Sequence, residues 1–184
     1  TYPDFRLRGE ELIKKLSSKT KLIIINSPNN PTGTVYPKDD LLMVARIARE
    51  RDLLILSDDI YDNFVFDAPT CPCMGQLYEK TLTFGGFSKG WGMTGWRLGY
   101  AAGPRDILQQ MITLQQYTFS SINSFAQKAA VKALDFKVDD YIERYKKKRD
   151  LIYEGLKEKY RVQKPLGAFY IFPEVPGRNG EAFV

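Results

Sequence analysis

Lys89 and Arg97 lie eight residues apart in a stretch made mostly of glycine, aromatic and small residues, GGFSKGWGMTGWRLG (residues 85–99). A lysine with so little charge around it can lose part of its hydration, which favours the free amine and suits Schiff-base chemistry. The planar guanidinium of an arginine suits a phosphate group. Taken singly, the lysine is better explained as a solvated loop residue, and the arginine is equally explained as half of an ion pair.

Three further residues offer complementary chemistry elsewhere in the chain. Asp58 ends an apolar run, where a carboxylate is costly unless a cationic group such as a protonated pyridine nitrogen meets it. Tyr61 and Asn30 can both donate to an oxygen of the same ligand. Asp58 is also explained as a helix cap, and Asn30 as turn chemistry. Together with the two cations, however, these groups match what pyridoxal phosphate requires.

The elements that must position these residues are short apolar segments, which we expect to be strands of one sheet. Lys21–Asn26 and Leu53–Leu56 flank a helix that begins at Pro37, an arrangement that indicates a parallel pair with a right-handed crossover. Thr81–Phe84 and Arg97–Ala102 are expected to be the third and fourth strands. Ligands of open α/β sheets bind beyond the carboxyl ends of parallel strands. The loops SPNNPTG, SDDIYDNF and GGFSKG are therefore expected to converge.

Helical patterns dominate the rest of the chain. A helical region is predicted over residues 104–134. Asp140 with Glu143 resembles a capping box, which predicts the start of another helix running towards Tyr160. The apolar residues 167–172 predict a final strand.

Composition narrows the possible chemistry. The 184 residues contain no histidine, which excludes Ser-His-Asp triads and histidine-based acid–base catalysis. The net charge of +5 is modest, and the basic run 144–149 is interpreted as a solvated helix face rather than a nucleic-acid patch. No apolar run reaches membrane-spanning length. Cys71 and Cys73 are interpreted as reduced residues of a surface loop, with no metal site.

Four motifs, NSPNNPTG, SDDIY, FSKGWGMTGWRLGY and GAFYIFP, occur in this order. They resemble those of the class I/II, fold-type-I pyridoxal-phosphate aminotransferases, nearest to the aspartate and aromatic aminotransferase subgroup, over nearly the whole chain. The resemblance implies a three-layer α/β/α fold with a mostly parallel sheet. Residues 1–135 would be part of the large cofactor-binding domain, and residues 136–184 the linking helix and the start of a small α+β domain.

The resemblance also implies roles for the residues. Lys89 would bind pyridoxal 5′-phosphate as a Schiff base and shuttle a proton, and Asp58 would keep the ring nitrogen protonated. Tyr61 and Asn30 would hold the phenolic oxygen, and Arg97 would bind the phosphate. The implied activity transfers an amino group between an α-amino acid, of aspartate or aromatic type, and a 2-oxo acid. The implied enzyme is a cytoplasmic homodimer without nucleic-acid, membrane or metal partners.

Two departures and two alternatives accompany this resemblance. Gly86 stands where many members carry a phosphate-binding serine. The N-terminal phosphate loop and the C-terminal arginine for the substrate carboxylate are missing, so we expect a segment of a longer enzyme. A β-lyase on the same scaffold, or a non-catalytic sensor domain that binds the cofactor, would use the same motifs.

Overall fold

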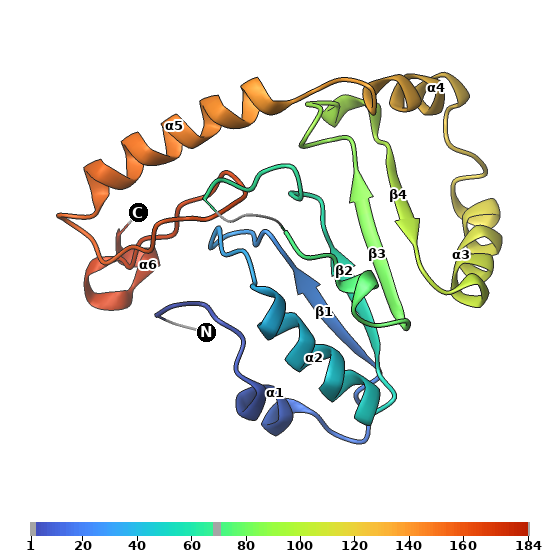
Figure 1. The fold of residues 1–184 in the computed structure, drawn as a ribbon, viewed down its shortest axis with the longest axis horizontal. Coiled ribbons are helices and arrows are strands. Elements are labelled where there is room, and N and C mark those ends of the chain that lie inside the picture. Colours follow the sequence, from blue (N-terminus) through green and yellow to red (C-terminus); the bar gives the residue numbers. More distant parts are fainter. Residues whose placement is uncertain (1–2, 68–70, 184) are drawn as a thin grey trace.

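The computed structural model describes residues 3–67 and 71–183, which are built around a four-stranded sheet (Figure 1). In spatial order its strands are β1 (Leu22–Asn26), β2 (Leu54–Asp58), β3 (Thr81–Gly86) and β4 (Gly99–Ala102). β1, β2 and β3 run parallel, and β4 pairs antiparallel with β3. The predicted α/β fold with a mostly parallel sheet is therefore confirmed.

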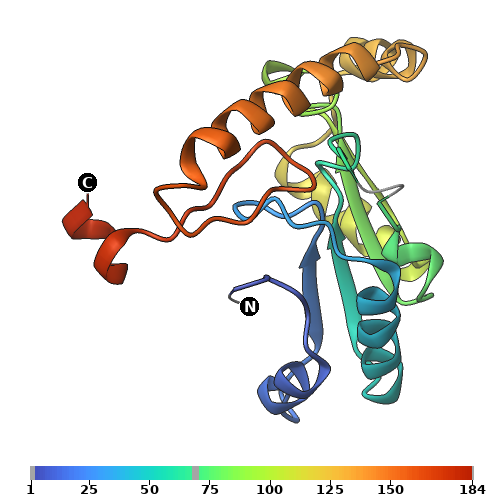
Figure 2. The ribbon, with the colours of Figure 1, turned by 60° about the vertical axis from the view of Figure 1, so that its left-hand side comes forward.

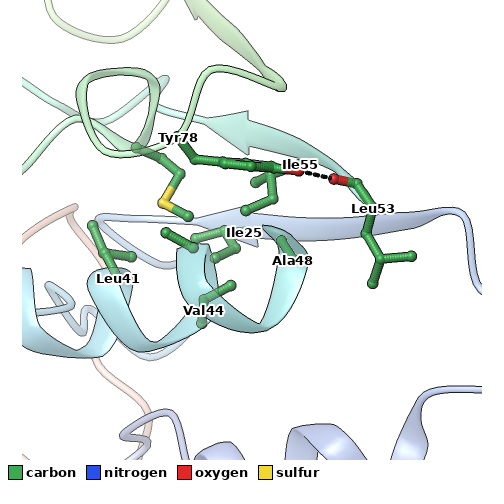
Figure 3. Close-up of a cluster of buried hydrophobic side chains, with 9 residues drawn as sticks. Ile25, Leu41, Val44, Ala48, Leu53, Ile55 and Tyr78 are labelled. Atoms are coloured by element: carbon green, nitrogen blue, oxygen red, sulfur yellow. Dashed lines mark hydrogen bonds between the residues drawn. The ribbon is translucent and has the colours of Figure 1, made fainter. Parts of the chain in front are cut away.

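The main core lies between the sheet and α2 (Lys38–Glu50), the crossover helix that joins β1 to β2 (Figure 3). Leu41 and Val44 of this helix are each 1% exposed and pack on the strand residues Ile25 and Ile55. Alternation along the strands points these two isoleucines to the same face. Burying each such side chain contributes about 1.5–3 kcal/mol, so this layer fixes the register of the two strands.

The core is bounded on one side by Tyr78, while the opposite face of the sheet is exposed. The buried Tyr78 hydroxyl donates to the Leu53 carbonyl oxygen at 2.8 Å (Figure 3). This bond satisfies a polar group that would otherwise be buried without a partner. On the face away from α2, Ile24 is 67% exposed.

The remaining helices surround the sheet and extend beyond it (Figure 1). They are α1 (Gly9–Lys15), α3 (Arg105–Thr118), α4 (Ser124–Ala133), α5 (Asp139–Leu156) and α6 (Gly180–Phe183), with single 3₁₀ turns at Met74–Gln76, Thr94–Trp96 and Pro176–Arg178. Within the described ranges, no helix combines the length and apolarity needed to cross a membrane. The domain boundary predicted after residue 135 lies between α4 and α5 and stays a prediction.

Two details of the predicted helices are wrong. The single helical region over residues 104–134 is divided into α3 and α4, because Ser120 adopts a left-handed backbone conformation with a φ of 60°. The Asn123 side chain then caps α4 by accepting hydrogen bonds from two backbone N–H groups of its first turn. The capping box at Asp140 does not form, since α5 begins at Asp139 and its N-cap, Val138, makes no side-chain cap hydrogen bond.

The strand predicted over residues 167–172 is also wrong. This segment returns between α5 and the sheet (Figures 1 and 2), and Gly167 forms an isolated bridge with Val65. Ala168 has a φ of 56°, which interrupts an extended conformation. Its backbone N–H donates to the Phe64 carbonyl oxygen at 2.9 Å. The segment is therefore fixed against the loop after β2 and does not form a strand.

Arg149 of α5 fastens the helix to this returning segment. Its side chain is 5% exposed, and Nη1 donates to the Pro165 carbonyl oxygen at 2.6 Å. The same nitrogen lies 2.8 Å from a carboxylate oxygen of Asp67, and the guanidinium carbon lies 4.9 Å from the centroid of the Phe66 ring. Because a buried charge needs such partners, the arginine fixes both chain segments against α5.

Candidate active site

Three loops leave the carboxyl ends of β1, β2 and β3 at one edge of the sheet. Asn26, Asp58 and Phe84 are register partners across these strands. Asn26 Nδ2 donates to the Asp58 carbonyl oxygen at 3.0 Å. The Asp59 backbone N–H donates to the Phe84 carbonyl oxygen at 2.9 Å. These bonds extend the pairing to the strand ends, so the loops begin side by side.

The loop after β1 positions Asn30. The Asn30 backbone N–H donates to Asn26 Oδ1 at 2.8 Å. At the far end of the loop Gly33 has a φ of 69°, a conformation that glycine adopts without strain. The Gly33 carbonyl oxygen accepts the backbone N–H groups of Leu166 and Gly167, each at 2.9 Å. The Asn30 side chain is exposed, and its amide lies near enough to the Tyr61 hydroxyl to lower the pKa of that phenol.

Tyr61 occupies the centre of the site and is 4% exposed. Burial raises the pKa of its phenol well above the ordinary value. The Asn30 amide opposes this rise and the nearby Asp58 charge adds to it. The Tyr61 hydroxyl therefore keeps its proton at neutral pH and can donate a hydrogen bond. Asp58 itself is half-buried at the end of β2, where its Oδ1 accepts the Ile60 backbone N–H at 3.3 Å.

Lys89 reaches the same place from the loop after β3. Its Nζ lies 5.8 Å from the centroid of the Tyr61 ring and 5.6 Å from that of the Phe169 ring, within cation–π range of both. The lysine is half-buried. Four of the five residues singled out from the sequence thus lie together, with Asn30, Asp58 and Lys89 around the Tyr61 side chain.

Arg97, the fifth residue, differs from expectation. It was predicted to begin a strand, but β4 begins at Gly99, and Arg97 has a left-handed φ of 51° that ends a 3₁₀ turn. Its side chain is exposed, and Nη1 donates to the Thr94 carbonyl oxygen at 2.9 Å. Among the described residues, no hydrogen bond joins the Arg97 side chain to Asn30, Asp58 or Tyr61.

Sequence reasoning missed two aromatic residues of the site. The Tyr170 hydroxyl lies 2.6 Å from the Tyr61 hydroxyl. The Phe169 ring packs edge-on against Tyr61 with centroids 5.2 Å apart. Both belong to the motif GAFYIFP, which was read as a strand. The sequence contained one signal for them: Phe169 and Tyr170 directly follow the small residues Gly167 and Ala168, at which the chain can turn and direct the two rings towards another loop.

A half-buried carboxyl group, that of Asp59, directly follows Asp58 in the chain. Ser57 Oγ donates to Asp59 Oδ1 at 2.6 Å. Burial raises the pKa of Asp59 to about 6, although the Ser57 and Cys73 hydrogen bonds work against this rise. Cys71 and Cys73 are free, but both are half-buried rather than on the surface. Burial raises the pKa of Cys71 to about 11, so it is a thiol at neutral pH.

Gly86, where the expected serine is missing, lies in a crowded position. A Cβ atom there would lie 3.0 Å from Ile60 Cδ1 and 3.3 Å from the Leu98 carbonyl oxygen. A larger side chain would force one of these neighbours to move. Glycine therefore fits the packing of this chain. Among the described residues, no group of three or more histidine, cysteine, aspartate or glutamate side chains could hold a metal ion.

Comparison with known proteins adds independent information. The profile of the family described as "Aminotransferase class I and II" matches residues 1–184. A probable aspartate aminotransferase of Methanocaldococcus jannaschii is 42% identical over 94% of this chain and 48% of its own length. Aromatic-amino-acid aminotransferase 2 of Thermococcus litoralis is 41% identical over 94% of this chain and 46% of its own length. An aromatic aminotransferase structure from Pyrococcus horikoshii superposes with a TM-score of 0.90 at 40% identity, over 94% of this chain and 48% of that one. The chain thus spans about half the length of these relatives.

Proposed function

Because the chain belongs to the class I and II aminotransferase family, we propose that it forms part of an aminotransferase that uses pyridoxal 5′-phosphate. The enzyme would move an amino group between an α-amino acid, of the aspartate or aromatic type, and a 2-oxo acid. The names of the relatives support this substrate class. The observation that carries the proposal is the approach of Lys89 Nζ to Tyr61, 5.8 Å from the ring centroid, beside Asp58 and Asn30.

The donor set fits this cofactor group by group. Lys89 offers an amine for the aldehyde and Asp58 a carboxylate for the pyridine nitrogen, while Tyr61 and Asn30 offer two donors for the phenolic oxygen. Arg97 offers a guanidinium for the phosphate, an assignment that rests on its motif alone. When bound, the cofactor supplies a ring that withdraws electrons from the substrate α-carbon.

Each residue of the site would then have its own role in the reaction. Lys89 would accept the proton of the substrate α-carbon at Nζ and return it as a general acid. Asp58 would favour, by its charge, a proton on the ring nitrogen. The Tyr61 hydroxyl, which burial keeps protonated, would donate to the ring oxygen. The rings of Tyr61 and Phe169 lie within 6 Å of the lysine amine and limit its contact with water.

A homodimer is the proposed assembly of the whole enzyme. Tyr117, Phe119 and Phe125 on and between α3 and α4 are 86%, 77% and 67% exposed. Large exposed apolar side chains that gather in one region mark contact surfaces. Sedimentation of the full-length protein tests this assembly, and a monomer at micromolar concentration would contradict it.

The activity is tested by incubating the full-length protein with pyridoxal 5′-phosphate, 2-oxoglutarate, and aspartate or an aromatic amino acid. Glutamate formation is the expected result. Pyruvate and ammonia from a cysteine conjugate, without glutamate, would instead indicate a β-lyase. Cofactor binding without any turnover would indicate a sensor domain.

The role of Lys89 is tested by the variant Lys89→Ala. Because the amine is the group that binds the aldehyde, borohydride treatment should fix the cofactor to the wild-type protein and not to the variant. Turnover should fall by several orders of magnitude, roughly 10³-fold or more. Lys132→Ala, which changes an exposed lysine of α4, serves as the control and should behave as wild type. A borohydride-stable adduct in Lys89→Ala would refute the assignment.

A further inference from the structure

Tyr170 contacts Tyr61 through both its hydroxyl group and its ring. The two hydroxyl oxygens lie 2.6 Å apart, and the rings meet edge to face at 85° with centroids 5.6 Å apart. Tyr170 comes from the returning segment, 109 residues later in the chain. The roles assigned under the proposed function do not use it.

The backbone on both sides of the site holds this segment in place. Ala168 is fully buried, and its N–H donates to the Phe64 carbonyl oxygen at 2.9 Å. The Gly167 N–H donates to the Gly33 carbonyl oxygen, also at 2.9 Å. The segment is thus joined to the loop after β1 and to the loop after β2. The Tyr170 hydroxyl is therefore held at a fixed place beside Tyr61 before any ligand binds.

A phenol oxygen has one hydrogen to donate and two lone pairs to accept with. The Asn30 amide lies near the Tyr61 hydroxyl and lowers the pKa of this phenol, as expected of a group that presents an N–H to one lone pair of the phenol oxygen. The Tyr170 hydroxyl is close enough to fill the other. With both lone pairs filled, the hydrogen of Tyr61 is left for a third atom.

We propose that Tyr170 is a positioning residue that donates to Tyr61 and so commits the Tyr61 hydrogen to the ring oxygen of the bound cofactor. This inference rests on the proposed function. Hydrogen bonds in a chain polarise one another, so a donation from Tyr170 also makes Tyr61 a stronger donor. A strong donor draws electron density from the ring oxygen, which then holds the neighbouring proton at Lys89 Nζ less firmly.

Tyr170→Phe in the full-length enzyme removes the hydroxyl and keeps the ring. We expect the pH midpoint of the visible absorbance change of the loaded enzyme to rise by about 0.5–1 unit, as for the loss of one hydrogen bond. The dissociation constant for pyridoxal 5′-phosphate should increase by about 3–10-fold. Tyr145→Phe is the matched control, because the Tyr145 ring packs 5.7 Å from that of Phe169 and no described hydrogen bond joins it to Tyr61. Its midpoint should equal that of wild type.

A double substitution separates positioning from packing. In a Tyr61→Phe background the atom through which Tyr170 acts is gone, so Tyr170→Phe should cause no further rise of the midpoint. A Tyr170→Phe midpoint equal to wild type, or an equal rise in both backgrounds, would overturn the inference. If the wild-type enzyme binds no pyridoxal 5′-phosphate at all, the proposed function fails instead, which a simple absorbance spectrum detects.

Discussion

Replacing Asp59 by asparagine should stabilise the folded protein at neutral pH. Partial burial raises the pKa of the carboxyl group, and the nearby charges of Asp62 and Asp58 raise it further. Asparagine keeps an oxygen to accept the 2.6 Å hydrogen bond from Ser57 Oγ and has nearly the same volume. The substitution therefore removes the charge with little change in packing.

The size and sign of the effect follow from the pKa. Moving the pKa of Asp59 from 3.8 to about 6 corresponds to about 3 kcal/mol. Since the side chain is only half-buried, screening reduces the expected value to about 2 kcal/mol. Between these two pH values the folded state holds a proton that the unfolded state has lost, so its stability increases as the pH falls through this window. The penalty of the charge is complete above about pH 6 and absent below about pH 4.

Urea titrations of the full-length protein at several pH values measure this effect. The difference in the free energy of unfolding between Asp59→Asn and wild type should grow from near zero at about pH 4 to about 2 kcal/mol at about pH 8. Asp135→Asn, at an exposed carboxylate after α4, should show no such growth. A pH-independent difference for Asp59→Asn, or a loss of stability at pH 8, would refute the reasoning.

Two further substitutions test the packing that supports the site, each measured as the free energy of unfolding of the full-length protein. Arg149→Met leaves the buried Pro165 carbonyl oxygen without its donor and should cost about 3 kcal/mol, against about 0.5 kcal/mol for the neighbouring exposed Lys148→Met; similar losses would contradict a buried anchor. Gly33→Ala would place Cβ 2.4 Å from Pro165 Cβ and should cost about 2–4 kcal/mol. Gly155→Ala, where a Cβ meets nothing within 4 Å, should instead stabilise α5 by up to about 1 kcal/mol, and a matching loss there would argue against steric strain at Gly33.

The sheet could be predicted from the sequence because its strands are short apolar runs, although one face of the sheet is open and Ile24 on it is exposed. Runs such as Lys21–Asn26 and Leu53–Leu56 are apolar on both sides, and few other elements suit such runs. Residues 167–172 carry a similar pattern, yet their conformation depends on contacts that local sequence does not reveal. The Gly33 and Phe64 carbonyl oxygens accept the N–H groups of Gly167 and Ala168. These long-range bonds hold Ala168 in a left-handed conformation, which interrupts the strand that the apolar pattern predicts.

The candidate site shows the same limit. Four of the predicted residues lie at or after the carboxyl ends of neighbouring parallel strands: Asn30, Asp58, Tyr61 and Lys89. Predicting the strands was therefore enough to predict that these residues meet. Tyr170 joins them from outside the sheet, and its place depends on how a distant segment packs. Arg97 was misplaced because Arg97–Ala102 reads as a strand, whereas the backbone turns left-handed at its first residue.

The separation of 109 positions between Tyr61 and Tyr170 also sets the order in which a ribosome synthesises the parts of the site. At about 5–20 residues per second, the loop after β2 is made roughly 5–20 s before Tyr170. During this interval the Gly33 and Phe64 carbonyl oxygens have no partner from the returning segment. The pocket of the nascent protein therefore stays incomplete and hydrated until residue 170 has left the ribosome.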